Sequence, residues 1–68
     1  MNTKWTPNPE GEYGEHYAKI QGHMITVSSD RDGEIWDCCI NGGEFFRLDA
    51  HSKYEAFREA EAIKLTPK

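Results

Sequence analysis

The chain lacks the features of exported and membrane proteins. No apolar stretch approaches the roughly 20 residues that a membrane-spanning helix needs. No charged segment followed by an apolar one opens the sequence, as a signal peptide would. The only cysteines, Cys38 and Cys39, are adjacent, so they cannot link distant segments, and in a strand one could be buried while the other faces outward. We therefore expect a soluble, unprocessed, cytoplasmic protein with reduced thiols.

Basic residues are also scarce. Twelve acidic residues against eight Lys and Arg give a net charge of -4, and residues 1–37 hold seven of the acids but only three of the bases. Binding to a nucleic-acid backbone depends on clustered Lys and Arg, so direct nucleic-acid binding is not expected. An acidic balance instead favours a partner protein with a basic surface, although a soluble domain can carry such a charge without any partner.

No metal or catalytic signature is present. The histidines (His16, His23 and His51) are isolated and the cysteines adjacent, whereas structural zinc sites use paired ligands. The turn 30–34 has its glycine too early for a calcium loop. Asp37 stands beside Cys38, so the surroundings do not favour a catalytic thiolate. We expect no cofactor, no metal and no enzymatic activity.

What is present is one small domain. Sixty-eight residues allow a single domain that buries roughly 60% of the surface of its unfolded chain. Residues 1–11 contain Pro7 and Pro9, which predict an extended arm or sheet edge. Trp5 is the only bulky apolar residue of this arm, and it either folds back onto the domain or anchors a partner.

Residues 12–65 alternate between strand and turn patterns before a single helical segment. Strands are predicted at 12–20, 23–28, 34–40 and 44–48, separated by turns at Gln21-Gly22, at 29–33 and at Asn41-Gly42. Ile25 and Val27 share one face of their strand, and Phe46 and Leu48 are expected on the core face of theirs. The pattern predicts an α+β fold with a three- to four-stranded antiparallel meander.

The last third changes to a helical period. Ser52 and Glu55 form a capping box for a helix from about 53 to 64, followed by a frayed tail at 66–68. Its apolar stripe (Ala56, Phe57, Ala60 and Ile63) can cover one face of the sheet. The other face is left open, and its apolar residues are expected among Tyr13, Tyr17, Met24, Ile35, Cys39 and Phe45.

The segment from Phe46 to Ile63 resembles the last strand and helix of the double-stranded-RNA-binding domain. That family grips phosphate with a lysine cluster at the helix start, whereas this chain has only Lys53, followed by Glu55 and Glu59. In size, charge and architecture the whole chain resembles phage and prophage accessory or inhibitor proteins, including anti-CRISPR proteins. A related pattern occurs in antitoxins of the HicB type. These resemblances imply stoichiometric binding without turnover.

Together these patterns predict a non-enzymatic protein-binding module, an inhibitor that occludes a nucleic-acid-handling host complex. Its partner would be a host protein or ribonucleoprotein with a basic surface, and its location the host cytoplasm if it is phage-encoded. The alternatives are a homodimeric structural or regulatory module, paired through the open sheet face, or a weak nucleic-acid binder. Glu10 joins the expected carboxylates, and the predicted binding residues are Trp5, Glu12, Tyr13, Glu15, Tyr17, Asp30, Asp32, Glu34, Asp37 and Phe45.

Overall fold

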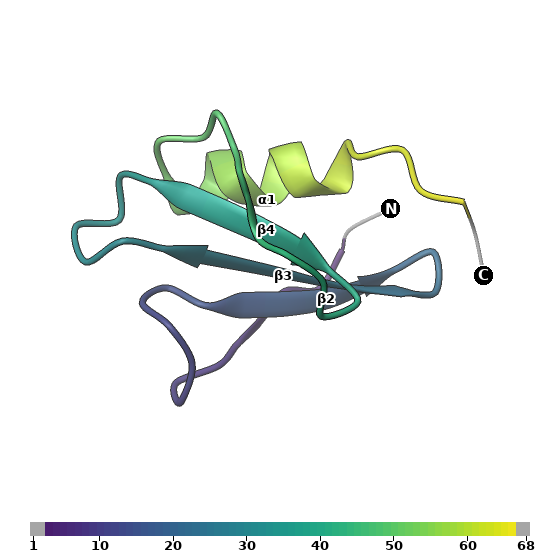
Figure 1. The fold of residues 1–68 in the computed structure, drawn as a ribbon, viewed down its shortest axis with the longest axis horizontal. Helices are drawn as coiled ribbons and strands as arrows, with labels where there is room; N and C mark the ends of the chain where they lie inside the picture. The colour runs from purple at the N-terminus through teal and green to yellow at the C-terminus, as the bar shows by residue number, and fades with distance from the viewer. Residues whose placement is uncertain (1–2, 67–68) are drawn as a thin grey trace.

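The chain folds into one antiparallel sheet with a helix across one face (Figure 1). The structure is a computed structural model and describes residues 3–66. Five strands lie in sequence order, and the elements are β1 (Thr6–Pro7), β2 (His16–Ile20), β3 (His23–Ser29), β4 (Trp36–Ile40), β5 (Phe46–Arg47) and α1 (Lys53–Glu61). The predicted α+β class and the C-terminal helix are confirmed. The predicted count of three to four strands is wrong, because the arm adds an edge strand.

Two tight turns lie at the ends of strands: Gln21-Gly22 joins β2 to β3, and Asn41-Gly42 follows β4. Gln21 and Gly22 have φ angles of 53° and 83°, and Asn41 and Gly42 have φ angles of 54° and 74°. Two successive residues with positive φ are the mark of the type I′ turn, whose twist matches that of the strands it joins. At the first turn Ile20 pairs with His23. At the second, the Asn41 side chain also accepts a hydrogen bond from the backbone N–H of Met24 at 2.9 Å.

The core lies between α1 and the sheet. Ile25 and Val27 of β3 and Cys38 of β4 are fully buried there. Ala56 and Ala60 of α1 are fully buried too, and such small side chains let the helix lie close to the strands. Trp5, Phe57 and Ile63 pack around this centre. The predicted apolar stripe is therefore confirmed for Ala56, Phe57 and Ala60, whereas Ile63 packs on the core from beyond the end of the helix.

The start of α1 follows its predicted cap, but its end does not. The Ser52 hydroxyl accepts a hydrogen bond from the Glu55 N–H at 3.3 Å, and the Glu55 carboxylate accepts one from the His51 N–H at 2.9 Å. The helix ends at Glu61, three residues before the predicted end, and Ala62 is its C-cap. In the predicted tail, the Thr66 carbonyl is hydrogen-bonded to His23, and residues 67–68 lie outside the described residues.

Several strand predictions need correction. The predicted strands at 12–20, 34–40 and 44–48 are shorter in the structure, and Tyr13 lies in the loop before β2. Phe46 shares the side of Cys38, with which it pairs, but is 42% exposed because β5 is a two-residue edge strand beyond the reach of α1. Cys38 and Cys39 are both buried, rather than one of them. Cys39 lies in β4, which has a strand on each side, and it is only 4% exposed although it faces away from the helix.

No helix among the described residues is long and apolar enough to cross a membrane.

Candidate protein-binding surface

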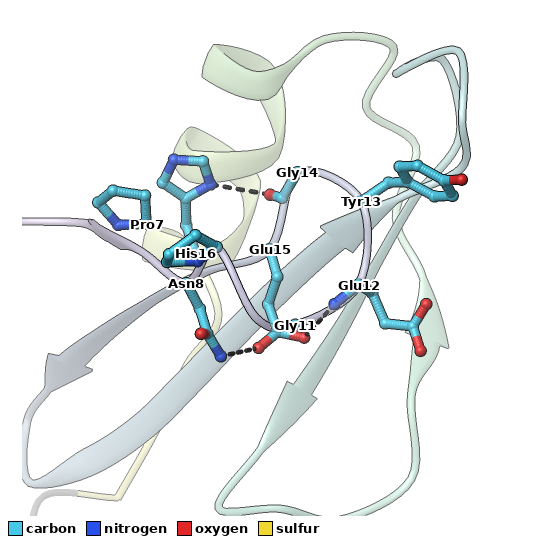
Figure 2. A pocket seen from close by; sticks show the side chains of 9 residues that line it. Pro7, Asn8, Gly11, Glu12, Tyr13, Gly14, Glu15 and His16 are labelled. Atoms are coloured by element: carbon cyan, nitrogen blue, oxygen red, sulfur yellow. Dashed lines mark hydrogen bonds between the residues drawn. The ribbon is translucent and has the colours of Figure 1, made fainter.

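The loop before β2 is closed around the side chain of Glu15 (Figure 2). Its carboxylate accepts hydrogen bonds from the Asn8 side-chain amide at 2.6 Å and from the Glu12 N–H at 3.1 Å. The Asn8 N–H donates to the Glu15 carbonyl at 2.9 Å. Figure 2 shows the Glu12 carboxylate and the Tyr13 ring pointing away from this closed loop. Glu15 therefore shapes the loop, while Glu12 and Tyr13 face outward.

This loop lines an open pocket of about 440 Å³. Its walls come from residues 7–9 and 11–16, so most of the lining belongs to one short segment of chain. His16 lies at one side, with its Nδ1 2.8 Å from the Gly14 carbonyl oxygen. A pocket made by one surface loop is an open concavity and not the apolar enclosure that small-molecule sites require.

The second loop, between β3 and β4, is organised by Asp30. Its carboxylate accepts hydrogen bonds from the N–H groups of Glu34 at 2.9 Å and of Ile35 at 3.2 Å. Gly33 turns the chain with a φ of 73°. The backbone hydrogen bonds from Ile35 and Glu34 lower the pKa of Asp30, because they stabilise the ionised carboxylate. Asp30 therefore holds its loop in shape through hydrogen bonds to the backbone of that loop.

The two loops lie side by side at one end of the sheet. The Ser29 N–H donates to the Tyr13 carbonyl at 2.8 Å, and the Arg31 guanidinium lies 6.0 Å from the centre of the Tyr13 ring. Gly14 has a φ of 61°, and a Cβ there would lie 2.7 Å from the Ser29 hydroxyl oxygen. Only glycine fits this junction. We call this region the acidic end; it comprises Glu10, Glu12, Glu15, Asp30, Asp32 and Glu34 with Tyr13 between the loops.

Exposure separates the members of the acidic end into two groups. Glu10, Glu12, Asp32 and Glu34 are exposed, whereas Glu15 and Asp30 are partly buried and hydrogen-bonded within their loops. Tyr13 is 55% exposed although its backbone is held by Ser29. An aromatic ring on a fixed backbone, at the same end of the sheet as four exposed carboxylates, suits contact with a cationic surface.

The other predicted binding residues lie away from the acidic end. Trp5 stacks on Phe57 of α1 with ring centres 4.6 Å apart, and its indole N–H donates to Glu61 at 2.7 Å. Tyr17 is 38% exposed on the sheet face opposite the helix. Asp37 forms an ion pair with Arg47 at 2.7 Å. Phe45 is 51% exposed beside β5. The structure therefore gathers six of the ten predicted residues and disperses four.

Sequence reasoning missed the residues that join the two loops. Gly14, Ser29 and Arg31 contact the other loop or its tyrosine across 15 or more positions of sequence. No local sequence pattern predicts a contact between two loops that are this far apart in the chain. The only available signal was the density of turn residues at 29–33, which predicted the second loop but not its neighbour.

The thiols are poorly suited to chemistry. Burial raises the pKa of the Cys38 thiol to about 11, with smaller contributions from Cys39 and Glu59. A buried, protonated thiol is a weak nucleophile. The His16 and His23 rings engage backbone carbonyl groups, and His23 also lies 2.8 Å from the Asn41 amide. Among residues 3–66, no three His, Cys, Asp or Glu side chains converge as a metal site would require.

Comparisons with models of protein families, with curated proteins and with solved structures found no match to this chain.

Proposed function

We propose that this protein is a non-enzymatic binding module whose acidic end occupies a basic surface of a nucleic-acid-handling protein or ribonucleoprotein. The observation that carries the proposal is the junction of the two loops at Ser29 and Tyr13. It brings carboxylates that are 20 or so positions apart in sequence to one end of the sheet.

The mechanism would be competition for cationic side chains. Lys and Arg that hold phosphate would meet Glu12, Asp32 and Glu34 instead, and long-range attraction would speed the encounter. Tyr13 would supply the contact that excludes water, since tyrosine is prominent among residues that dominate interface energies. The resulting complex would block the partner by occupancy, as an inhibitor from a phage or prophage would in the host cytoplasm.

Preorganisation supports this use of the acidic end. Asp30 and Glu15 hold both loops through hydrogen bonds to backbone or amide groups, so the exposed carboxylates lie on shaped loops. Binding then costs less ordering entropy than it would for a flexible acidic tail.

The test is affinity capture with charge-reversed bait. We expect immobilised wild-type protein to capture a nucleic-acid-binding protein from a bacterial lysate, and the double variant Glu12→Lys, Asp32→Lys to lose it. With the purified captured protein, the double variant should associate about tenfold more slowly or worse, with a flatter salt dependence. Glu44→Lys is the control, because Glu44 is an exposed acid in the segment after β4, at the other end of that strand from the acidic end.

A second measurement checks the occlusion. The captured protein should bind its nucleic acid more weakly when wild-type protein is added, and unchanged when the double variant is added. Capture that is equal for the wild type and the double variant, or recovery of nothing but this protein itself, would contradict the proposal.

A further inference from the structure

The two edges of the sheet differ in how well they are protected against pairing with another strand. At the β1 edge, Pro7 has no backbone N–H and cannot donate to an added strand. At the β5 edge, no proline is present, and Phe45 and Phe46 are 51% and 42% exposed. Natural sheets protect their edges with proline, charge or covering elements, and an apolar open edge invites pairing. The β5 edge is therefore the one without proline, and its only charged side chain, Arg47, is ion-paired with Asp37 of β4.

The register of β5 shows which of its backbone groups are free. Asp37 pairs with Arg47 and Cys38 with Phe46, and the Leu48 N–H donates to the Trp36 carbonyl at 2.9 Å. Hydrogen-bonded and non-hydrogen-bonded pairs alternate along an antiparallel ladder. Phe46 and Leu48 are thus directed at β4. Phe45 and Arg47 direct their N–H and C=O groups outward, and β5 is the outermost strand of the described residues.

We propose that two copies of this chain pair through their β5 edges, antiparallel, about a two-fold axis that passes between the two Phe46 residues. In this register Phe45 of each copy lies opposite Arg47 of the other. Their outward N–H and C=O groups form four backbone hydrogen bonds, and the two sheets become one continuous sheet. Such an interface is isologous, because the same surface serves on both copies.

The side chains favour this register over its neighbours. The two Phe46 rings meet at a non-hydrogen-bonded pair, where side chains across the strands come closest. On the other face, each Phe45 ring meets an Arg47 guanidinium, which suits a cation–π contact. A shift of two residues in one direction places Arg47 opposite Arg47. A shift in the other direction pairs Phe45 with Phe45 but places Glu44 opposite each Phe46 and removes the contact between Phe45 and Arg47. The proposed register alone pairs aromatic with aromatic and aromatic with cation.

The net charge is compatible with a second copy as the occupant. Each chain carries a net charge of -4, much of it at the acidic end, which lies beyond one end of β5. Antiparallel pairing sends the two acidic ends in opposite directions, so their repulsion is small. The pairing also leaves both acidic ends free, and the inference stands independently of the proposed function. Because the contact is short, the dimer should be weak and concentration-dependent.

The first test measures oligomeric state by sedimentation from micromolar to millimolar concentration. Wild-type protein should shift reversibly from monomer to dimer. Phe46→Asp should remain monomeric, since it places two carboxylates face to face on the axis. Phe45→Pro should do the same by removing an outward N–H at a position where an edge strand tolerates proline. Circular dichroism identifies any variant that fails to fold. The oligomeric state of the variant that does fold then tests the proposal.

The matched control is Met24→Asp, which places the same charge at an exposed position on the sheet face away from the helix. It should leave the dimer intact. A wild type that stays monomeric throughout overturns the proposal. So does a dimer that Met24→Asp breaks and the β5 variants do not, because that dimer would use the open face.

A cross-linking experiment tests the register itself. Phe46→Cys should form a covalent dimer with oxidised glutathione, because the two Cα atoms of a non-hydrogen-bonded pair lie about 4.5 Å apart, within disulfide range. Phe45→Cys should cross-link at least tenfold more slowly, since residue 45 lies opposite residue 47. Because Cys38 pairs with residue 46 on the same face, both variants are made in a Cys38→Ala background, so that no disulfide can form within one chain. Cys39 is buried and should stay unreacted. Equal cross-linking of the two variants would refute this register.

Discussion

Single residues decide the shape of the acidic end before any partner is met. Asp30 holds its loop by accepting two backbone hydrogen bonds, and Gly14 allows the two loops to touch. Neither residue would be recognised as special from its type alone, since aspartate and glycine are common in turns. Some of the acidic residues therefore hold the loops in shape. Counting every carboxylate as a partner-binding group would overestimate the number of residues that can contact a partner.

The Asp30 hydrogen bonds predict an acid-dependent stability. The pKa of Asp30 is lowered from 3.8 in the fold, so ionisation stabilises the folded state at pH values above that of the unfolded carboxyl. This contribution is lost as the pH falls below about 4 and through the lower folded pKa. Asp30→Asn should be less stable than wild type at pH 7, and the difference should shrink toward pH 2.

Urea denaturation between pH 2 and 7 measures this effect. Asp32→Asn is the control, because it removes the same charge two residues away without removing the hydrogen bonds to Glu34 and Ile35. If the two variants show the same dependence of unfolding free energy on pH, the carboxylate of Asp30 does not stabilise the loop as we describe.

At the scale of elements, the N-terminal arm belongs to the structure in two ways. Thr6 and Pro7 add a short strand to β2, and Trp5 packs on the helix at the other side of the core. The arm therefore links the edge of the sheet to α1. A segment that looks like a loose extension in sequence closes one side of the domain.

Removing the Trp5 ring should loosen this link. Trp5→Ala should lower the unfolding free energy by about 1–2 kcal/mol, through lost stacking on Phe57 and lost burial. Trp5→Phe is the matched variant, since it retains an aromatic ring that can stack on Phe57 and loses the hydrogen bond to Glu61 with part of the ring area. It should recover most of the loss. Equal destabilisation by both substitutions would mean that the hydrogen bond, not the stacking, holds the arm.

At the scale of the whole molecule, the stability rests on few large side chains. Ile25, Val27 and Cys38 are the largest side chains that are fully buried, and the helix contributes mainly alanine to the centre. A domain of this length has a stability of about 3–10 kcal/mol, from typical values per residue. The loss of one core side chain is therefore a large fraction of the total.

Ile25→Ala should remove a large fraction of the free energy of unfolding. Truncation of a fully buried isoleucine costs about 2–5 kcal/mol, because it removes apolar burial and leaves a cavity. We expect the variant to be partly or largely unfolded at 37 °C, as thermal unfolding followed by circular dichroism would record. Met24→Ala changes the neighbouring residue on the exposed face and should cost less than about 1 kcal/mol. Similar midpoints for the two variants would show that the centre of the core lies elsewhere.

Local patterns predicted those features that are produced by local forces. Asn41-Gly42 predicted its turn because glycine and asparagine tolerate positive φ, and Ser52 with Glu55 predicted the helix start because their side chains reach the first free N–H groups. Alternation along β3 predicted the burial of Ile25 and Val27. The open position of Phe46 was not predictable in the same way, because its exposure depends on where α1 crosses the sheet.

The sequence by itself determined the order of the elements, their turns, the acidic charge and the apolar stripe of the helix, since each follows from the preferences of neighbouring residues. Tertiary structure alone decided which residues share a surface. It brought Tyr13 against Ser29, docked Trp5 on Phe57, buried Cys39 and left the β5 edge bare. These are contacts between segments far apart in the chain, and the free energy that selects them comes from packing, burial and backbone pairing that no short window of sequence contains.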